Sequence, residues 1–290
     1  MSCRTIGKIM ELRVFFLVLF AAFTHAVWNF FSKKASGSLQ VTLAGLWMAN
    51  LTLLPVSLYI ISVNGLTLYE LRFMSVTALA HISYYYFLYL GYRKGDISVV
   101  YPVARGTGIA GTAVFAFLLL GESFSPSGVA GIALIFSGVI IISLKRKLIK
   151  GDLSVLVYAV CVGASIITYS VNDKAGVAHT NPVAYLNLKD MMALSLMTPF
   201  VFRKGLPQIK ETFKKSWKYS IIIGYGALGT YLMILYAFTL ANAGYISAVR
   251  EFSIVIGSVL GIIFLKEKIT PGKIMGIALI TAGLILIKLS

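Results

Sequence analysis

The sequence is poor in the residues that build most catalytic and metal sites. It holds two cysteines, three histidines and ten Asp plus Glu residues, against 26 Lys plus Arg. Cys3 and Cys161 form neither a disulfide framework nor a metal-ligand spacing. There is no P-loop, no dinucleotide fingerprint after a strand and no nucleophile elbow. These absences exclude an ATP-driven pump, give no reason to expect a cofactor, and leave a membrane-embedded enzyme as a remote alternative.

Charged residues of both signs are also scarce. They make up 12% of the chain, whereas hydrophobic residues make up 58% and the mean hydropathy is +0.87. A soluble domain of this composition would have too little polar surface. A bilayer core needs about 20 apolar residues per helix, and ten stretches of roughly that length fill the chain, near residues 12–31, 40–62, 72–91, 98–119, 127–144, 152–171, 182–202, 218–240, 245–265 and 271–289.

We therefore predict an all-α membrane protein of ten transmembrane helices. Helices are expected because lipid cannot satisfy exposed backbone N–H and C=O groups. The longest connection, residues 203–217, is too short for a soluble domain.

The net charge of +16 raises the question of a nucleic-acid partner. Most Lys and Arg residues lie at helix ends, where such residues set orientation and contact anionic lipid head groups. We expect membrane lipids, not nucleic acid, as partners. The connections after the odd-numbered spans are the more basic, which by the positive-inside rule places both termini outside. An even number of spans puts both termini on the same side.

The two halves of the chain repeat each other. Residues 120–138 (LGESFSPSGVAGIALIFSG) align with residues 265–283 (LKEKITPGKIMGIALITAG), and nine of the nineteen positions are identical. The same shift of 145 residues aligns Glu122 with Glu267 and Arg105 with Arg250. Ser125-Pro126 and Thr270-Pro271 are typical helix starts.

Five spans per repeat is an odd number, so the second repeat must enter the membrane from the opposite side. We expect two inverted five-helix repeats, residues 1–145 and 146–290, that form one transmembrane domain. Inverted repeats are typical of secondary transporters with a site near the bilayer midplane. Glycines of the last two spans (Gly257, Gly261, Gly272 and Gly276) favour close helix packing, within one chain or in a homodimer.

Three segments carry a resemblance to a known family: residues 25–29 (HAVWN), residues 95–106 (GDISVVYPVARG), and the Gly121-Glu122…Pro126…Gly131…Gly138 pattern with its second copy. Over its whole length the chain resembles the drug/metabolite transporter superfamily, in particular its EamA-type ten-helix members. The resemblance implies a secondary carrier of the inner (plasma) membrane, with a cavity lined mainly by spans 1, 3, 4, 6, 8 and 9 and with spans 5 and 10 peripheral.

Two points depart from the family or leave a question open. The resemblance implies that both termini lie in the cytoplasm, whereas the charges of the connections place them outside. The second repeat has Ala248-Val249-Arg250-Glu251 where the first has Val103-Ala104-Arg105-Gly106, so the halves are not functionally equivalent.

Polar side chains at membrane depth are candidates for function. Grouped by helical face, the expected substrate-binding residues are His25, Trp28, Asn29, Tyr85, Tyr89, Tyr101, Arg105, Tyr169, Asn172, Tyr236 and Arg250. The expected proton carriers are Glu251, Asp190 and His25. Structural alternatives exist for several: interfacial tyrosines for Tyr89, an ion pair for Arg250 with Glu251, and a buried pairing of Lys189 with Asp190.

The predicted function is that of an ion-driven, proton-coupled transporter of a small anionic or amphoteric metabolite, with export favoured over uptake. Arg105, together with Arg250, is expected to bind the anionic group. The alternative is a translocase for lipids or lipid-linked intermediates.

Overall fold

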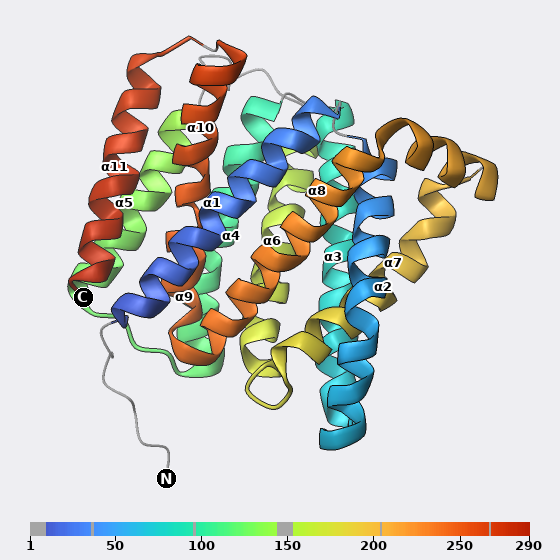
Figure 1. The fold of residues 1–290 in the computed structure, drawn as a ribbon. Coiled ribbons are helices and arrows are strands. Elements are labelled where there is room, and N and C mark those ends of the chain that lie inside the picture. The colour runs from blue at the N-terminus through green and yellow to red at the C-terminus, as the bar shows by residue number, and fades with distance from the viewer. Residues whose placement is uncertain (1–9, 36–37, 95–96, 144–152, 204, 267) are drawn as a thin grey trace.

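The computed structural model describes residues 10–35, 38–94, 97–143, 153–203, 205–266 and 268–290 (Figure 1). Within these residues all regular structure is helical, as predicted, and the eleven helices are α1 (Leu12–Lys34), α2 (Leu39–Asn64), α3 (Leu68–Lys94), α4 (Ile97–Leu120), α5 (Pro126–Ser143), α6 (Leu153–Gly176), α7 (Pro182–Val201), α8 (Leu206–Leu240), α9 (Ala243–Arg250), α10 (Phe252–Leu265) and α11 (Pro271–Lys288). The motif residues Gly95 and Asp96, the boundary between residues 145 and 146, and Glu267 lie outside the described residues.

The eleven helices correspond to the ten predicted spans because α9 and α10 form one span, broken at Glu251. Seven segments are long and apolar enough to cross a membrane, and α5 is a shorter apolar helix. The remaining helices, α3 and α7, carry more polar side chains: the middle of α7 holds Asn187, Lys189 and Asp190.

One predicted connection contains a helix that the sequence analysis did not predict. Residues 203–217 were expected to link two spans, but α8 already begins at Leu206 and bends at Ser216, whose φ of −137° and ψ of 20° are not helical. Pro207 in the first turn has no N–H to leave unpaired there, which suits a helix start. Because this segment is rich in lysine, it does not form an apolar run, and a helix was not predicted there.

The helix starts predicted from the repeat are confirmed. The Ser125 hydroxyl accepts a hydrogen bond from the Gly128 N–H (3.0 Å), and the Thr270 hydroxyl accepts one from the Lys273 N–H (3.3 Å). Each cap satisfies one of the backbone donors that a helix start leaves unpaired.

The repeats are related by symmetric contacts between α5 and α11. A Cβ added at Gly131 would lie 2.7 Å from the Gly283 carbonyl oxygen, and one added at Gly138 would lie 2.7 Å from that of Gly276. Since Gly131 aligns with Gly276 and Gly138 with Gly283, each contact is the image of the other. The two helices run antiparallel (Figure 1), as inverted repeats require.

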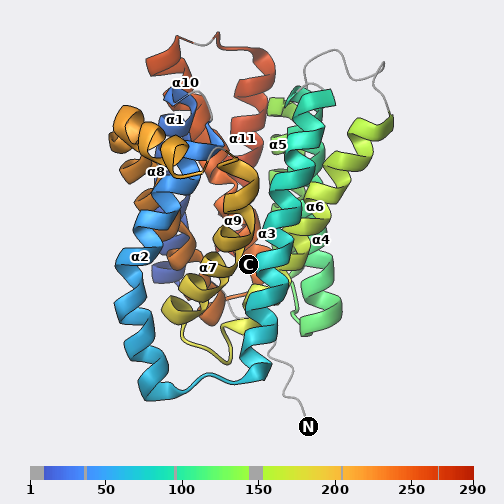
Figure 2. The ribbon, with the colours of Figure 1, turned by 90° about the vertical axis from the view of Figure 1, so that its right-hand side faces the viewer.

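The helices of the two repeats are interlaced. In the first repeat α3 and α4 pack against α6, and in the second α8 and α9 pack in the same way against α1. We call the group α3, α4, α6 and α7 the first half-bundle, and the group α1, α2, α8, α9 and α10 the second half-bundle. Figure 2 shows α2 and α8 on one side and α4 and α6 on the other.

Both ends of the described chain lie at the same face, as an even number of spans requires. The Lys288 ammonium donates a hydrogen bond to the Met10 carbonyl oxygen (3.2 Å). We call this face the terminal face (bottom of Figure 1).

The half-bundles are tied together at the terminal face. The Glu122 carboxylate, in the α4–α5 connection, accepts hydrogen bonds from the Ala243 N–H (2.7 Å) and the Gly244 N–H (3.3 Å) at the start of α9. The Lys174 ammonium at the end of α6 donates to the carbonyl oxygens of Phe238 and Ala241 at the end of α8. Both contacts use polar groups that helix ends leave unpaired.

The α5–α11 contact predicts that Gly276→Ala lowers the thermal stability of the purified protein. The new Cβ would lie 2.3 Å from Ile142 Cγ1 and 2.7 Å from the Gly138 carbonyl oxygen, and such overpacking costs about 1–3 kcal/mol. Gly272→Ala is the control, since its Cβ meets only the Ile141 carbonyl oxygen at 3.5 Å. Equal melting temperatures for the two variants would contradict this packing.

The buried position of Glu122 predicts a pH dependence of stability. Burial raises the pKa of the Glu122 carboxyl, against the opposing effect of the Ala243 N–H. The stability that protonation gives is present in full below the usual glutamate pKa of about 4.3 and is lost as pH rises through the raised folded-state value. Glu122→Gln keeps an acceptor without charge, so its melting temperature should fall less over this range. The exposed Glu211→Gln should keep the parent slope, and a parent-like slope in Glu122→Gln would contradict the prediction.

Candidate functional site

A cavity of about 620 Å³ lies between the half-bundles. Helices α1, α2, α3, α4, α6, α7, α8, α9 and α10 line it, whereas α5 and α11 contribute only Ile142 and Lys273. The lining reaches Lys33 at the end of α1 and Lys273 at the start of α11, which lie at the face opposite the terminal face (Figure 1). At the terminal face, the contacts of Glu122 and Lys174 join the half-bundles.

Most of the predicted site residues line this cavity. They are His25, Trp28, Asn29, Tyr85, Tyr101, Arg105, Tyr169, Asp190 and Arg250. Two of them touch, since the His25 and Trp28 rings meet edge to face with centroids 5.0 Å apart. The structure thus gathers residues of both repeats around one space.

Three predicted substrate-binding residues lie elsewhere. Tyr89 and Tyr236 are 59% and 54% exposed on the outer faces of their helices, where tyrosine is common in membrane proteins. Asn172 is bound within the bundle, where its amide donates to the Phe73 carbonyl oxygen (2.7 Å) and to the Thr77 hydroxyl (2.8 Å). These three play no part in the function proposed below.

Arg105 and Glu251 form a bidentate ion pair at the cavity wall. Arg105 Nε lies 3.0 Å from Glu251 Oε2, and Arg105 Nη2 lies 2.8 Å from Glu251 Oε1. Their side chains are 9% and 2% exposed. Two parallel bonds in a poorly solvated site are the strongest form of this contact. The charge of each group is thus matched by the other, and Glu251 is not among the residues that line the cavity.

Arg250 is placed differently from Arg105, although the repeat aligns them. It lines the cavity, is 5% exposed, and its Nε has no hydrogen-bond partner in the part of the chain that the structure describes. Buried guanidinium groups are normally paired, because leaving their donors unmet costs several kcal/mol. Arg250 therefore offers an unmet cationic donor at the centre of the fold.

The chain passes from α9 to α10 at Glu251. Arg250 ends α9, and Glu251 lies between the two helices, where its N–H bonds to the Ala248 carbonyl oxygen in the tighter pattern of a helix end. A continuous helix would place successive side chains about 100° apart with all backbone groups used internally. Interrupted helices are a recurrent device at the binding sites of membrane transporters.

A second ion pair lies across the cavity on α7. Lys189 Nζ is 2.6 Å from Asp190 Oδ1, as the sequence suggested. The same ammonium lies 4.3 Å from the centroid of the Tyr231 ring, a favourable cation–π contact.

The aromatic wall of the cavity contains residues that sequence reasoning did not select. His81 stacks on Tyr169 with centroids 4.5 Å apart and meets Tyr231 edge to face at 5.5 Å. Tyr84 and Tyr231 line the cavity as well. In α8 the predicted face was that of Tyr236, but the residues that line the cavity include Ala227, Thr230, Tyr231 and Ile234, at spacings of three and four residues. That spacing indicates a shared helix face, and its polar residues are Thr230 and Tyr231.

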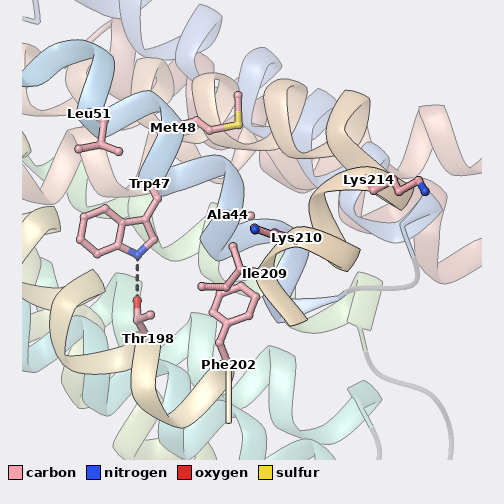
Figure 3. A pocket seen from close by; sticks show the side chains of 9 residues that line it. All are labelled: Ala44, Trp47, Met48, Leu51, Thr198, Phe202, Ile209, Lys210 and Lys214. Atoms are coloured by element: carbon pink, nitrogen blue, oxygen red, sulfur yellow. Dashed lines mark hydrogen bonds between the residues drawn. The ribbon is translucent and has the colours of Figure 1, made fainter. Parts of the chain in front are cut away.

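A second, apolar groove of about 500 Å³ lies between α2, α7 and the start of α8 (Figure 3). Trp47 Nε1 donates to the Thr198 hydroxyl (2.8 Å) across it, and Lys210 and Lys214 stand at its edge. None of the predicted site residues lines it. In the described residues no group of three or more His, Cys, Asp or Glu side chains is placed to hold a metal ion.

The Arg105–Glu251 pair predicts a strong and reciprocal effect on stability. Arg105→Gln should cost about 3–5 kcal/mol, because it leaves a buried carboxylate unpaired. Arg105→Gln combined with Glu251→Gln should recover most of this loss. Thermal unfolding of the purified protein measures both.

The control is Arg13→Gln at the exposed Arg13–Glu11 pair, which should change stability by less than about 1 kcal/mol. A double variant as unstable as the sum of the two single variants would contradict the pairing.

Comparisons with known proteins identify the family of the chain. The model of the "EamA-like transporter family" matches residues 12–144 and 149–289. Two curated relatives, both named "Multidrug resistance protein EbrB" and from Bacillus subtilis (strain 168) and Bacillus atrophaeus, are each 37% identical over 62 residues, or 21% of this chain. The match spans about half of those relatives, 53% of their length.

A solved crystal structure shares the fold, with a TM-score of 0.71 and 16% identity over 96% of both chains. Since the family model covers nearly all of the chain in two copies, this multi-pass membrane protein belongs to the EamA-like transporter family.

Proposed function

We propose that the protein carries a small metabolite with an anionic group across the plasma (inner) membrane, and that Arg250 binds that group. The observation that carries the proposal is the unmet Nε donor of Arg250 in the wall of the central cavity. A carboxylate, phosphonate or phosphate would supply the missing acceptor and the opposite charge.

This assignment moves the anion site from Arg105 to Arg250. The Arg105 guanidinium already holds the Glu251 carboxylate through two bonds, so an anion bound there would have to displace a bidentate partner. Arg105 then acts as a fixed neighbour that neutralises Glu251 and keeps that carboxylate from competing for Arg250.

The rest of the cavity favours an amphoteric or aromatic ligand. Trp28, Tyr85, Tyr101 and Tyr169 supply ring faces. Asp190 is 19% exposed beside Lys189 and lines the same space, which gives a carboxylate oxygen for an ammonium group. A free amino acid or a related zwitterion combines both charges at a suitable size.

Transport follows the alternating-access scheme in this proposal. The half-bundles are joined at the terminal face by Glu122 and Lys174, and the cavity reaches toward the opposite face. An ion gradient, in the first instance of protons, would drive the exchange of these two arrangements. The curated relatives named multidrug resistance proteins support export over uptake. A homodimer is compatible with the exposed apolar faces of the helices.

The test is a thermal-shift screen of the detergent-purified protein against monocarboxylates, amino acids, phosphonates, sugar phosphates, cationic drugs and lipid head groups. A ligand that binds the folded state raises its apparent stability. We expect an anionic hit whose affinity falls roughly 10- to 100-fold in Arg250→Gln, since a hydrogen bond to a charged group contributes about 1.5–3 kcal/mol.

The matched control is Arg203→Gln, which removes an exposed arginine outside the cavity and should leave the affinity unchanged. Anion binding that survives Arg250→Gln would remove the proposed site. A cationic drug as the main ligand would make the anion proposal wrong, and a lipid head group would favour the translocase alternative.

A further inference from the structure

Asp173 is a buried carboxylate that the site described so far does not use. It lies in the last turn of α6, is fully buried, and accepts hydrogen bonds from hydroxyl groups on three other helices. The Thr77 hydroxyl on α3 donates to Oδ1 at 2.5 Å, the Tyr185 hydroxyl on α7 donates to Oδ1 at 2.8 Å, and the Tyr231 hydroxyl on α8 donates to Oδ2. Asp173 thus joins four helices.

Asp173 differs from the other carboxylates of the membrane interior in having no cationic partner. Glu251 is paired with Arg105 and Asp190 with Lys189, whereas no Lys or Arg of the described residues lies within salt-bridge distance of Asp173. Its position near the carbonyl end of α6 adds the partial negative charge of the helix terminus. A buried charge without a counter-ion is costly, and such a group takes up a proton instead.

The hydroxyl cluster can satisfy both protonation states of Asp173. In the ionised state all three hydroxyls donate to the carboxylate. If Oδ2 is protonated it donates to the Tyr231 oxygen, and the Tyr231 hydroxyl turns to the cavity that Tyr231 lines. The Thr77 and Tyr185 hydroxyls still donate to Oδ1. The Asn172 amide donates to Thr77 in either state. No group loses its partner, because each hydroxyl both donates and accepts.

The cluster lies one side chain away from the cavity. Tyr231, which donates to Asp173, also lines the cavity, and so does His81, whose Nδ1 lies 2.9 Å from the Thr77 carbonyl oxygen. The titratable and charged groups that face the cluster are His81 from α3, Tyr185 and Lys189 from α7, Tyr231 from α8 and, through Tyr231, Arg250 from α9. The adjacent Lys174 is directed to the end of α8.

We propose that Asp173 is a proton-binding site that exchanges its proton with the central cavity through Tyr231, and that it carries the coupling proton. The role of Asp173 in coupling rests on the proposed function, whereas proton binding by Asp173 does not. Thr77, Asp173 and Tyr185 belong to the first half-bundle and Tyr231 to the second. Protonation replaces a charge-assisted bond between Tyr231 and Asp173 by a weaker neutral one, which loosens the contact between half-bundles.

Infrared difference spectroscopy of the purified protein in lipid tests the site without any substrate. Protonated carboxyl groups have a C=O stretch that carboxylates lack, so a pH change across the carboxyl titration range reports each buried acid. We expect one such band to be lost in Asp173→Asn and kept in Asp190→Asn and Glu251→Gln.

Tyr231→Phe is a second variant, which tests the site even if Asp173→Asn does not fold. It keeps the carboxyl but removes one hydrogen bond to it, so the band should remain and move in frequency. A full set of titrating bands in Asp173→Asn, or an unmoved band in Tyr231→Phe, would overturn the assignment.

A second measurement on the same variants separates this inference from the proposed function. Asp173→Asn, compared with the parent protein, should keep the Arg250-dependent binding of an anionic ligand. If the Asp173 band titrates but no anion binds at Arg250, the proton site holds and the proposed function fails. If the anion binds and the Asp173 band never titrates, the proposed function holds and the proton site fails.

Discussion

The Arg105–Glu251 ion pair is the contact on which the rest of the site depends. It joins α4 of the first half-bundle to the break between α9 and α10 in the second, at bond lengths of 2.8 and 3.0 Å. In a site with little water such a pair holds only when both groups keep their partner. Glu251 is bound to Arg105, and the Nε of the adjacent Arg250 has no hydrogen-bond partner among the described residues. The two repeats differ here, since Gly106 stands in the first where Glu251 stands in the second.

Among the described residues, the carboxylates of Glu251, Asp190 and Asp173 lie inside the bundle and have different kinds of partner. Glu251 is held by Arg105 and Asp190 by Lys189, so each has a cationic partner. In the part of the chain that the structure describes, the hydrogen-bond partners of Asp173 are neutral hydroxyls, and this network has two satisfied arrangements. A transporter must hold some charges fixed and let one change. In the proposed scheme these roles fall on different helices, with Asp173 in the last turn of α6 and Arg250 in the cavity wall.

The fold was largely predictable, because each helix that crosses the membrane needs about 20 apolar residues and because the repeat can be recognised in the sequence. The caps at Ser125 and Thr270 and the symmetric glycines of α5 and α11 follow from local chemistry. The break at Glu251 and the helix from Leu206 to Ser216 were not predicted. The break lies inside a single predicted span, and the helix lies outside any apolar run, so hydropathy detects neither.

The site was less predictable, because helical spacing identifies residues that share a face but not which face meets the cavity. In α8 the predicted residue was Tyr236, which is 54% exposed, and not Tyr231. The predicted ion-pair partner of Glu251 was its neighbour Arg250, whereas the structure pairs Glu251 with Arg105, a contact between distant helices. Asp173 was not among the predicted site residues, because it lies at the end of a span beside Lys174 and only the tertiary structure buries it.

The most direct test of the central claim is a structure of the protein with a bound anionic ligand. The account predicts that the anion lies within hydrogen-bond distance of the Arg250 guanidinium while Arg105 remains paired with Glu251. A ligand that takes Arg105 from Glu251, or that binds in the cavity without touching Arg250, would contradict it.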